Sequence, residues 1–148
     1  MKPSSSPAGV ENPLTSIYVA RQPIFDARKS LFAYELLFRD SLTNMIPPIE
    51  GDIATSKLLL NSFLSIGLES LSGGHKVFIN FTQNLISQEI PALFPTGQTV
   101  VEILEDVRPE ADVIRACRSL SGKGYLLALD DFVFQDGMEP LIELADII

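Results

Sequence analysis

The sequence predicts an α/β fold: a β-hairpin followed by a mostly parallel sheet. Short apolar runs alternate with helix-like patterns from residue 77 onward, and the run 125–129 is almost continuously apolar. Strands that alternate with helices of this length form βαβ units, and a continuous apolar strand is typical of a parallel sheet buried on both faces. Roughly three or four such units follow the hairpin, about half of a closed eight-stranded barrel.

The first elements are a short strand in 17–25, a turn at 26–29 and a second strand in 30–39. Successive residues of a strand point to opposite faces, so the second strand should carry one functional face and one apolar face. The predicted functional face holds Ala33, Glu35, Leu37 and Arg39, and the predicted apolar face holds Phe32, Tyr34, Leu36 and Phe38.

A proline-containing loop is expected at 44–51, and a helix is expected to begin at Asp52 and to end at the Ser-Gly-Gly sequence 72–74. The remaining elements follow in alternation. They are a strand at 77–81, a short helix capped by Thr82, a strand at 98–104, a helix from Pro109 to Gly122, a strand at 125–129, a helix at 139–144 and the start of another strand at 146–148.

Composition restricts the class of protein. The net charge of −8 argues against a DNA-binding protein, and residues 1–16 have the Ser- and Pro-rich composition of a disordered leader. The sequence shows no secretory signal and no membrane span. The single cysteine, Cys117, lies on the apolar side of a predicted helix, which is typical of a buried residue in a cytoplasmic protein.

Four apolar runs each deliver an oxygen donor at or near a strand end. The donors are Glu35, Asn80, Glu102 and the pair Asp130 and Asp131. Carboxylates placed against an apolar core are costly unless they are paired or bound to a cation. Because ligands of parallel α/β folds bind at the carboxyl ends of the strands, these donors predict a site for a hard metal ion.

The same residues resemble a known family. The sequence Gln22-Pro23-Ile24, followed by Glu35-Leu36-Leu37-Phe38-Arg39, is similar to the opening of EAL domains, the cyclic di-GMP phosphodiesterase family, with Leu36 in place of the family's alanine. The similarity continues through Phe78-Ile79-Asn80, Val101-Glu102-Ile103-Leu104-Glu105 and Ala128-Leu129-Asp130-Asp131-Phe132. It covers about residues 17–148, the first half of the family's pattern, and looks most like the subgroup that joins an EAL domain to an HDOD domain.

The resemblance implies an incomplete TIM-like (β/α) barrel that uses Mg²⁺ or Mn²⁺. Glu35, Asn80, Glu102 and Asp130 would be metal ligands, and Asp131 would serve a second metal. Leu37 and Arg39 would contact cyclic di-GMP, with Arg39 on a phosphate, and Gln22 is a further candidate contact. An HDOD domain or another protein is the partner that the resemblance implies.

The chain also departs from the family. Val133-Phe134-Gln135-Asp136-Gly137 replaces a Gly-Thr-Gly-like loop, and the family's later lysine and acidic residues would lie beyond Ile148. We therefore expect a signalling module that binds nucleotide or protein without catalysis. The alternative is an active phosphodiesterase when the barrel is continued or assembled. A half barrel has open edges, so the sequence predicts a shortened or degenerate product, or a homo-oligomer that covers the open side.

Some residues keep two interpretations. Arg39 could instead pair with Asp40 or Glu35, and Asp130 with Asp131 could be a polar strand end or a helix cap. Glu105 is expected at the surface. The sequence Gly122-Lys123-Gly124 lacks the P-loop pattern and indicates a helix end followed by a turn.

Overall fold

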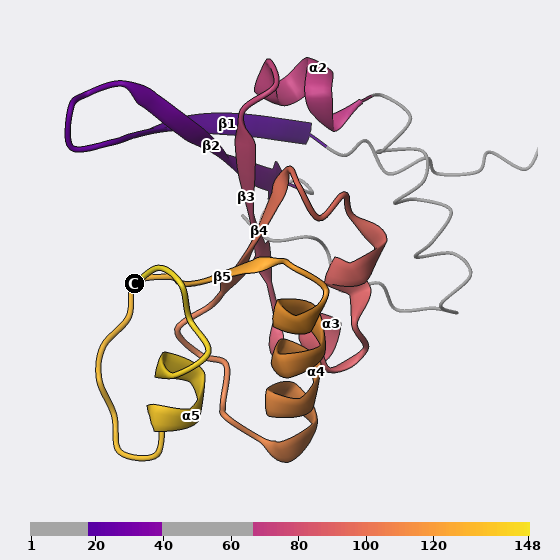
Figure 1. The fold of residues 1–148 in the computed structure, drawn as a ribbon, viewed down its shortest axis with the longest axis vertical. Coiled ribbons are helices and arrows are strands. Elements are labelled where there is room, and N and C mark those ends of the chain that lie inside the picture. Colours follow the sequence, from indigo (N-terminus) through magenta and orange to yellow (C-terminus); the bar gives the residue numbers. More distant parts are fainter. Residues whose placement is uncertain (1–17, 40–66) are drawn as a thin grey trace, which may run out of the picture.

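The computed structural model describes residues 18–39 and 67–148, which form a five-stranded sheet in the order β1-β2-β3-β4-β5 (Figure 1). The strands are β1 (Tyr18–Phe25), β2 (Leu31–Arg39), β3 (Lys76–Phe81), β4 (Thr99–Ile103) and β5 (Leu126–Leu129). β1 is antiparallel to β2, and every later pair is parallel. The expected α/β fold with an opening hairpin is confirmed.

The hairpin projects from the rest of the sheet (Figure 1), and the side chain of Asp26 closes its turn. Oδ1 of Asp26 accepts hydrogen bonds from the backbone N–H groups of Arg28 and Ser30, both at 2.8 Å. An Asp side chain that bonds the backbone two residues ahead stabilises a tight turn locally. Lys29 takes the positive φ of 63° that this turn requires.

The predicted alternation along β2 is wrong at Phe32. Ile24 is opposite Ala33 and Phe25 is opposite Leu31, so Phe32 is the extra residue of a β-bulge. A bulge re-aims the side chains next to it. Phe32 therefore packs edge-on against Phe78, with ring centroids 6.3 Å apart, instead of facing the same side as Leu36.

The helical segments are α2 (Leu68–Ser72), α3 (Gln83–Ser87), the 3₁₀ turn η1 (Ile90–Leu93), α4 (Ala111–Gly122) and α5 (Glu139–Ile142). α2 ends at Gly73, whose left-handed backbone confirms the predicted stop. The expected leader 1–16, the loop 44–51 and the expected helix start at Asp52 lie outside the described residues.

Several predicted boundaries shift. α4 begins at Ala111 with Glu110 as its N-cap residue, so Pro109 precedes the helix instead of lying in its first turn. Thr82 is the N-cap residue of α3 but makes no side-chain capping bond. α5 ends at Ile142, and the expected strand at 146–148 is reduced to a single parallel bridge between Ala128 and Ile147.

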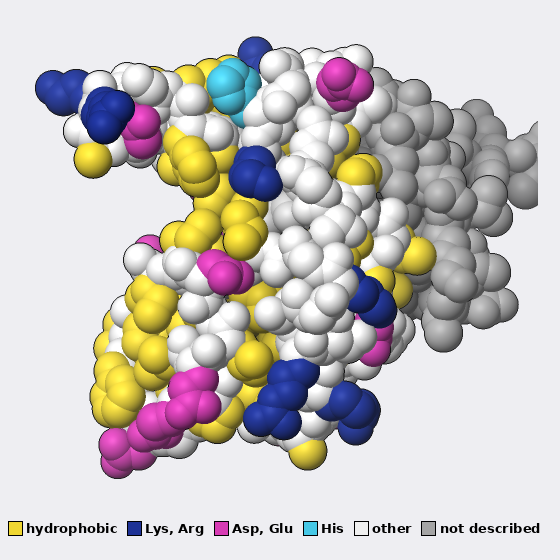
Figure 2. Space-filling view, in the orientation of Figure 1, with side chains coloured by type: hydrophobic (Ala, Val, Ile, Leu, Met, Phe, Trp, Pro, Cys, Tyr) yellow, Lys and Arg dark blue, Asp and Glu magenta, His cyan; other side chains and the backbone are white. Residues whose placement is uncertain are grey.

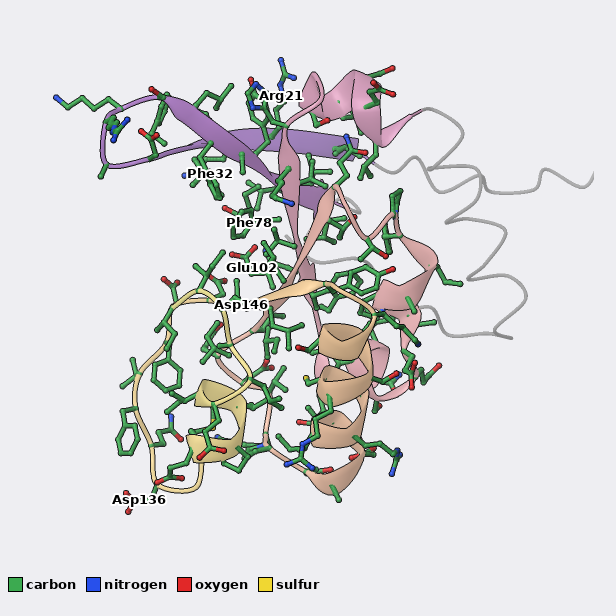
Figure 3. The ribbon with its side chains drawn as sticks, viewed as in Figure 1. Arg21, Phe32, Phe78, Glu102, Asp136 and Asp146 are labelled. Atoms are coloured by element: carbon green, nitrogen blue, oxygen red, sulfur yellow. The ribbon has the colours of Figure 1, made fainter. Side chains whose placement is uncertain are left out.

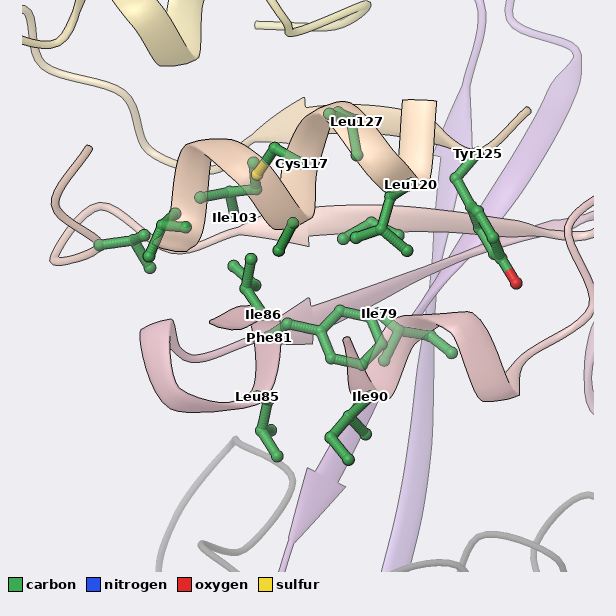
Figure 4. Packing of buried hydrophobic residues seen from close by; sticks show 14 of the residues in the cluster. Ile79, Phe81, Leu85, Ile86, Ile90, Ile103, Cys117, Leu120, Tyr125 and Leu127 are labelled. Carbon is green, nitrogen blue, oxygen red and sulfur yellow. The ribbon is translucent and has the colours of Figure 1, made fainter. Parts of the chain in front are cut away.

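The main core lies between the sheet and the helices (Figure 4). Ile79 and Phe81 of β3, Ile103 of β4 and Leu127 of β5 face this side, where α3, η1 and α4 cover them. Cys117 is fully buried here, as expected, and burial raises the pKa of its thiol to about 11. The thiol is therefore an apolar packing group.

The opposite face of the sheet, which we call the inner face, carries a smaller apolar cluster of Ala33, Phe78, Val100 and Ala128. Phe32 beside it remains 42% exposed. Hydrophobic side chains line the hollow beneath the hairpin (Figure 2). Within residues 18–39 and 67–148, the helices thus cover one side of the sheet, and no described helix packs on the inner face.

Within the described ranges, no helix has the length and apolar content that crossing a membrane requires.

Candidate metal and nucleotide site

The register of the sheet brings the predicted donors to one edge of the inner face. Asn80 on β3 is directly opposite Glu102 on β4, and Asp130 follows the last residue of β5. Gln22 is directly opposite Glu35 across the hairpin. Directly opposite residues point to the same face, so all five strands contribute to one site.

Glu35 and Asn80 are in contact. Nδ2 of Asn80 donates a hydrogen bond of 3.1 Å to Oε1 of Glu35. Burial raises the pKa of Glu35, the Asn80 bond partly opposes that rise, and the charges of Asp130 and Asp131 add to it. The amide therefore fixes one carboxylate oxygen and leaves its own Oδ1 buried without a partner among the described residues.

Glu102, which is labelled in Figure 3, is the most buried acid of the site. Its side chain is 8% exposed, and Oε2 has no hydrogen-bond partner in the part of the chain that the structure describes. Burial raises its pKa to about 8, with smaller contributions from the charges of Asp130, Glu35 and Asp131. Without a positive partner, this carboxyl is held partly protonated near neutral pH.

Asp130 and Asp131 are arranged differently from each other. The backbone N–H of Asp130 donates to the carbonyl of Ile103 at 2.9 Å, which ties the end of β5 to β4. Burial raises the pKa of Asp130, followed by the charges of Asp131 and Glu105. Asp131 is exposed and takes a left-handed backbone with φ of 43°. The chain therefore turns sharply just after Asp130.

The predicted nucleotide contacts are only partly described. Leu37 is half-buried and lies two residues after Glu35, and Gln22 is exposed beside Glu35. The backbone of Arg39 ends β2, but its side chain is outside the described part of the chain. Its two interpretations, phosphate contact and ion pair, both stay predictions.

The donor chemistry suits a hard divalent cation, but a finished coordination shell is not formed. Two buried oxygens, Oδ1 of Asn80 and Oε2 of Glu102, have no described partner, and oxygen donors are what Mg²⁺, Mn²⁺ and Ca²⁺ prefer. Among residues 18–39 and 67–148, no three His, Cys, Asp or Glu side chains are arranged to hold a metal ion. Carboxylates that repel one another would have to draw together around the cation.

A link between loops is a feature that the sequence did not reveal. The side-chain Oε1 of Gln83 accepts the backbone N–H of Arg108 at 2.9 Å, and the Arg108 guanidinium donates to Oε1 of Gln135 at 2.8 Å. These residues connect the start of α3 with the loops after β4 and β5. They are far apart in sequence and share no spacing, so no local pattern could have indicated them.

Solved structures share the fold of this chain. An EAL domain protein from Listeria monocytogenes matches with a TM-score of 0.58 over 90% of this chain and 62% of that chain, at 20% identity. The Bacillus subtilis YkuI protein, which has an EAL domain and was crystallised with its substrate cyclic di-GMP and calcium, matches with a TM-score of 0.56 at 15% identity. That match covers 86% of this chain and 39% of YkuI. The chain has the fold of part of an EAL domain.

Two curated proteins are similar in sequence to most of this chain. The uncharacterized protein YuxH of Bacillus subtilis is 43% identical over 137 residues, which are 89% of this chain and 34% of YuxH. The cyclic di-GMP phosphodiesterase CdgJ of Vibrio cholerae is 40% identical over 139 residues, which are 93% of this chain and 32% of CdgJ. The chain thus spans about a third of the length of these curated relatives. No protein-family model matches it.

Proposed function

We propose that this chain is the cation- and nucleotide-binding part of a cytoplasmic signalling module related to cyclic di-GMP phosphodiesterases. The observation that supports this most directly is the edge of the inner face, where Glu35, Asn80 and Glu102 meet with two buried oxygens unsatisfied. The names of CdgJ and of the YkuI complex support cyclic di-GMP as the ligand class.

In this proposal Glu35, Asn80, Glu102 and Asp130 hold a Mg²⁺ or Mn²⁺ ion, and Asp131 serves a second. A divalent cation at such a site neutralises the clustered carboxylates and polarises a phosphodiester. The protein's part is to orient the donors. The Asn80 amide fixes Glu35, and strand pairing fixes Asn80 next to Glu102. Leu37, Gln22 and Arg39 are the proposed contacts to the nucleotide.

We further propose that these 148 residues bind cyclic di-GMP without hydrolysing it. A phosphodiester hydrolase benefits from a cationic group near the attacking water, and the described lysines lie elsewhere. Nζ of Lys76 donates to the carbonyl of Gly97 at 3.0 Å, Lys123 pairs with Glu89 at 2.7 Å, and Lys29 is in the hairpin turn.

The retained acids favour a second candidate function, hydrolysis by the same site when further barrel strands are supplied by continuation or assembly. The single parallel bridge at Ile147 supports it, because the sheet begins to extend beyond β5 there. An HDOD domain or another protein remains the proposed partner.

The test is calorimetric titration of the 148-residue chain with cyclic di-GMP in the presence and absence of Mn²⁺, with product analysis of the same samples. We expect Mn²⁺-dependent binding, no linear dinucleotide product, and loss of binding in Glu102→Gln. The control is Glu69→Gln, which makes the same change on an exposed residue of α2. Turnover that Glu35→Ala abolishes would establish the second candidate. Equal binding by wild type and Glu102→Gln would refute the proposed site.

A further inference from the structure

A hollow on the helix side of the molecule lies outside the site described above. Its volume is about 490 Å³, and it is lined by Pro109, Ala111, Ile114, Arg115, Arg118 and Pro140. These residues come from the start of α4, the segment before it, and α5. Lys and Arg side chains gather over α4 here, beside Asp and Glu side chains over the α5 region (Figure 2).

The two arginines are notable in a chain with 19 acidic and 11 basic residues. Both are exposed, and neither makes a hydrogen bond or ion pair within the part of the chain that the structure describes. Side chains three residues apart on a helix are neighbours, with Cβ atoms about 5–6 Å apart. Arg115 and Arg118 therefore present two guanidinium groups along the same side of the hollow.

The other four lining residues have apolar side chains. Pro109 and Pro140 have no N–H, and the N–H of Ile114 is already bonded to the carbonyl of Glu110. Sites for free phosphate use several converging backbone N–H groups, and of these four residues only Ala111 could supply one. A ligand with carboxylates at one end and an apolar side chain at the other fits the lining better.

Acidic groups nearby restrict the orientation of such a ligand. Glu110 and Asp112 lie at the start of α4, and Glu139 precedes Pro140. The hydrogen bond with Lys123 is the main cause that lowers the pKa of Glu89, and the charge of Arg115 makes a smaller contribution. Like charges repel, so a ligand's carboxylates are favoured only at the arginine side. The hollow thus has a charged side and an apolar side.

We propose that this hollow docks an acidic peptide segment of a partner protein, with carboxylates on Arg115 and Arg118 and an apolar side chain against Ile114. Charge complementarity supports an acidic occupant at one side of the hollow, because the guanidinium groups of Arg115 and Arg118 have no acidic partner among the described residues. Bidentate guanidinium–carboxylate contacts would fix its direction. The docking site is separate from the metal site and does not depend on cation binding.

The probe is a fluorescein-labelled octapeptide that alternates glutamate with leucine, titrated by anisotropy into the full 148-residue chain. The control peptide alternates glutamine with leucine. We expect saturable binding of the glutamate peptide, and Arg115→Glu with Arg118→Glu should weaken it by about tenfold or more, because charge-assisted bonds are lost and repulsion replaces them. Arg28→Glu, the same change in the exposed hairpin turn, should leave binding unchanged.

Saturating Mn²⁺ and cyclic di-GMP should not displace the peptide, so this test is independent of the nucleotide site. No binding of the glutamate peptide, equal binding of the glutamine peptide, or equal weakening by Arg28→Glu would overturn the proposal. Sedimentation of the same variants tests the other possible occupant of the hollow, a second copy of this chain. If the two charge reversals change the oligomeric state of the peptide-free chain, the hollow is an interface between copies and the proposal is wrong.

Discussion

Glu102 shows how a single buried acid can report on the site. Its pKa of about 8 lies far above the ordinary value of 4.5 because the side chain is buried among other carboxylates. Between these two values the folded chain holds a proton that the unfolded chain has lost. The stabilising contribution of neutral Glu102 is therefore complete below pH 4.5 and is lost as the pH rises through about 8.

We expect the urea midpoint of the cation-free chain to fall between pH 5 and pH 8, and Glu102→Gln to flatten that fall because glutamine cannot ionise. Chemical denaturation at several pH values measures it. Glu69→Gln, on exposed α2, should keep the wild-type slope. A Glu102→Gln slope equal to that of wild type would show that Glu102 is not the group responsible.

A second prediction concerns the hydroxyl group of Tyr125 and its contribution to stability. Its hydroxyl donates a 2.6 Å hydrogen bond to the carbonyl of Phe94, and the ring is buried. Tyr125→Phe leaves the buried carbonyl without its donor, so we expect a loss of about 1–3 kcal/mol in the free energy of unfolding. The control is Ile142→Leu, a conservative change of a half-buried residue of α5 that should lower the free energy of unfolding only slightly. A loss below that of the control would contradict the expected role.

At the level of elements, the hairpin depends on its turn more than on packing at its tip. Asp26 accepts two backbone hydrogen bonds there, while Phe25 is 58% exposed. We expect Asp26→Ala to destabilise the hairpin by about 0.5–1.5 kcal/mol per lost bond, measured as faster hydrogen exchange in β1 and β2. Arg28→Ala keeps the backbone N–H donor and should have little effect. Faster exchange spread evenly over α4 as well would contradict a local role.

Local patterns predicted most of the elements but few of their details. Apolar runs and glycines placed β3, β4, β5 and the end of α2, because periodicity and backbone freedom are properties of short segments. The bulge at Phe32 was missed because it depends on pairing with β1. The start of α4 shifted because its first hydrogen bond runs from the N–H of Ile114 to the carbonyl of Glu110, which leaves Pro109 before the helix. The Gly122-Lys123-Gly124 interpretation as a helix end and turn is confirmed by Lys123 as the C-cap residue and by φ of 90° at Gly124.

In the candidate site too, local sequence patterns predicted the residues but not the long-range contacts between them. Oxygen donors that follow apolar runs could be read directly from the sequence, so Glu35, Asn80, Glu102 and Asp130 were all anticipated in one site, although Glu35 lies in the middle of β2 and not at its end. The hydrogen bond from Asn80 to Glu35 joins residues 45 positions apart, and no local spacing predicts such a bond. The connection between Arg108 and Gln135 was missed for the same reason.

At the level of the whole molecule, the apolar side chains of the inner face bear on self-association. Its cluster of Ala33, Phe78, Val100 and Ala128 is buried, but Phe32 beside this cluster is 42% exposed. An exposed aromatic ring next to an apolar cluster favours association. The predicted homo-oligomer stays a prediction, and the part of the inner face around Phe32 is the surface on which we expect it to form.

We expect sedimentation velocity to show concentration-dependent self-association of the 148-residue chain, and Phe32→Asp to weaken it. Phe134→Asp, which changes an exposed phenylalanine on the loop before α5, is the matched control. A stable monomer at all concentrations, or equal weakening by both variants, would contradict association through the inner face.

The pairing of Asn80 with Glu102 has an evolutionary consequence. Their separation is set by the hydrogen-bonded ladder between β3 and β4 and not by the segments that connect these strands. Insertions and deletions between the strands can therefore accumulate in descendants without moving the two donors. One residue deleted inside β4 before Glu102 would instead rotate that carboxylate to the helix side and bring a neighbouring aliphatic residue to the edge. Length variation should thus be tolerated between the strands of this lineage and selected against within them.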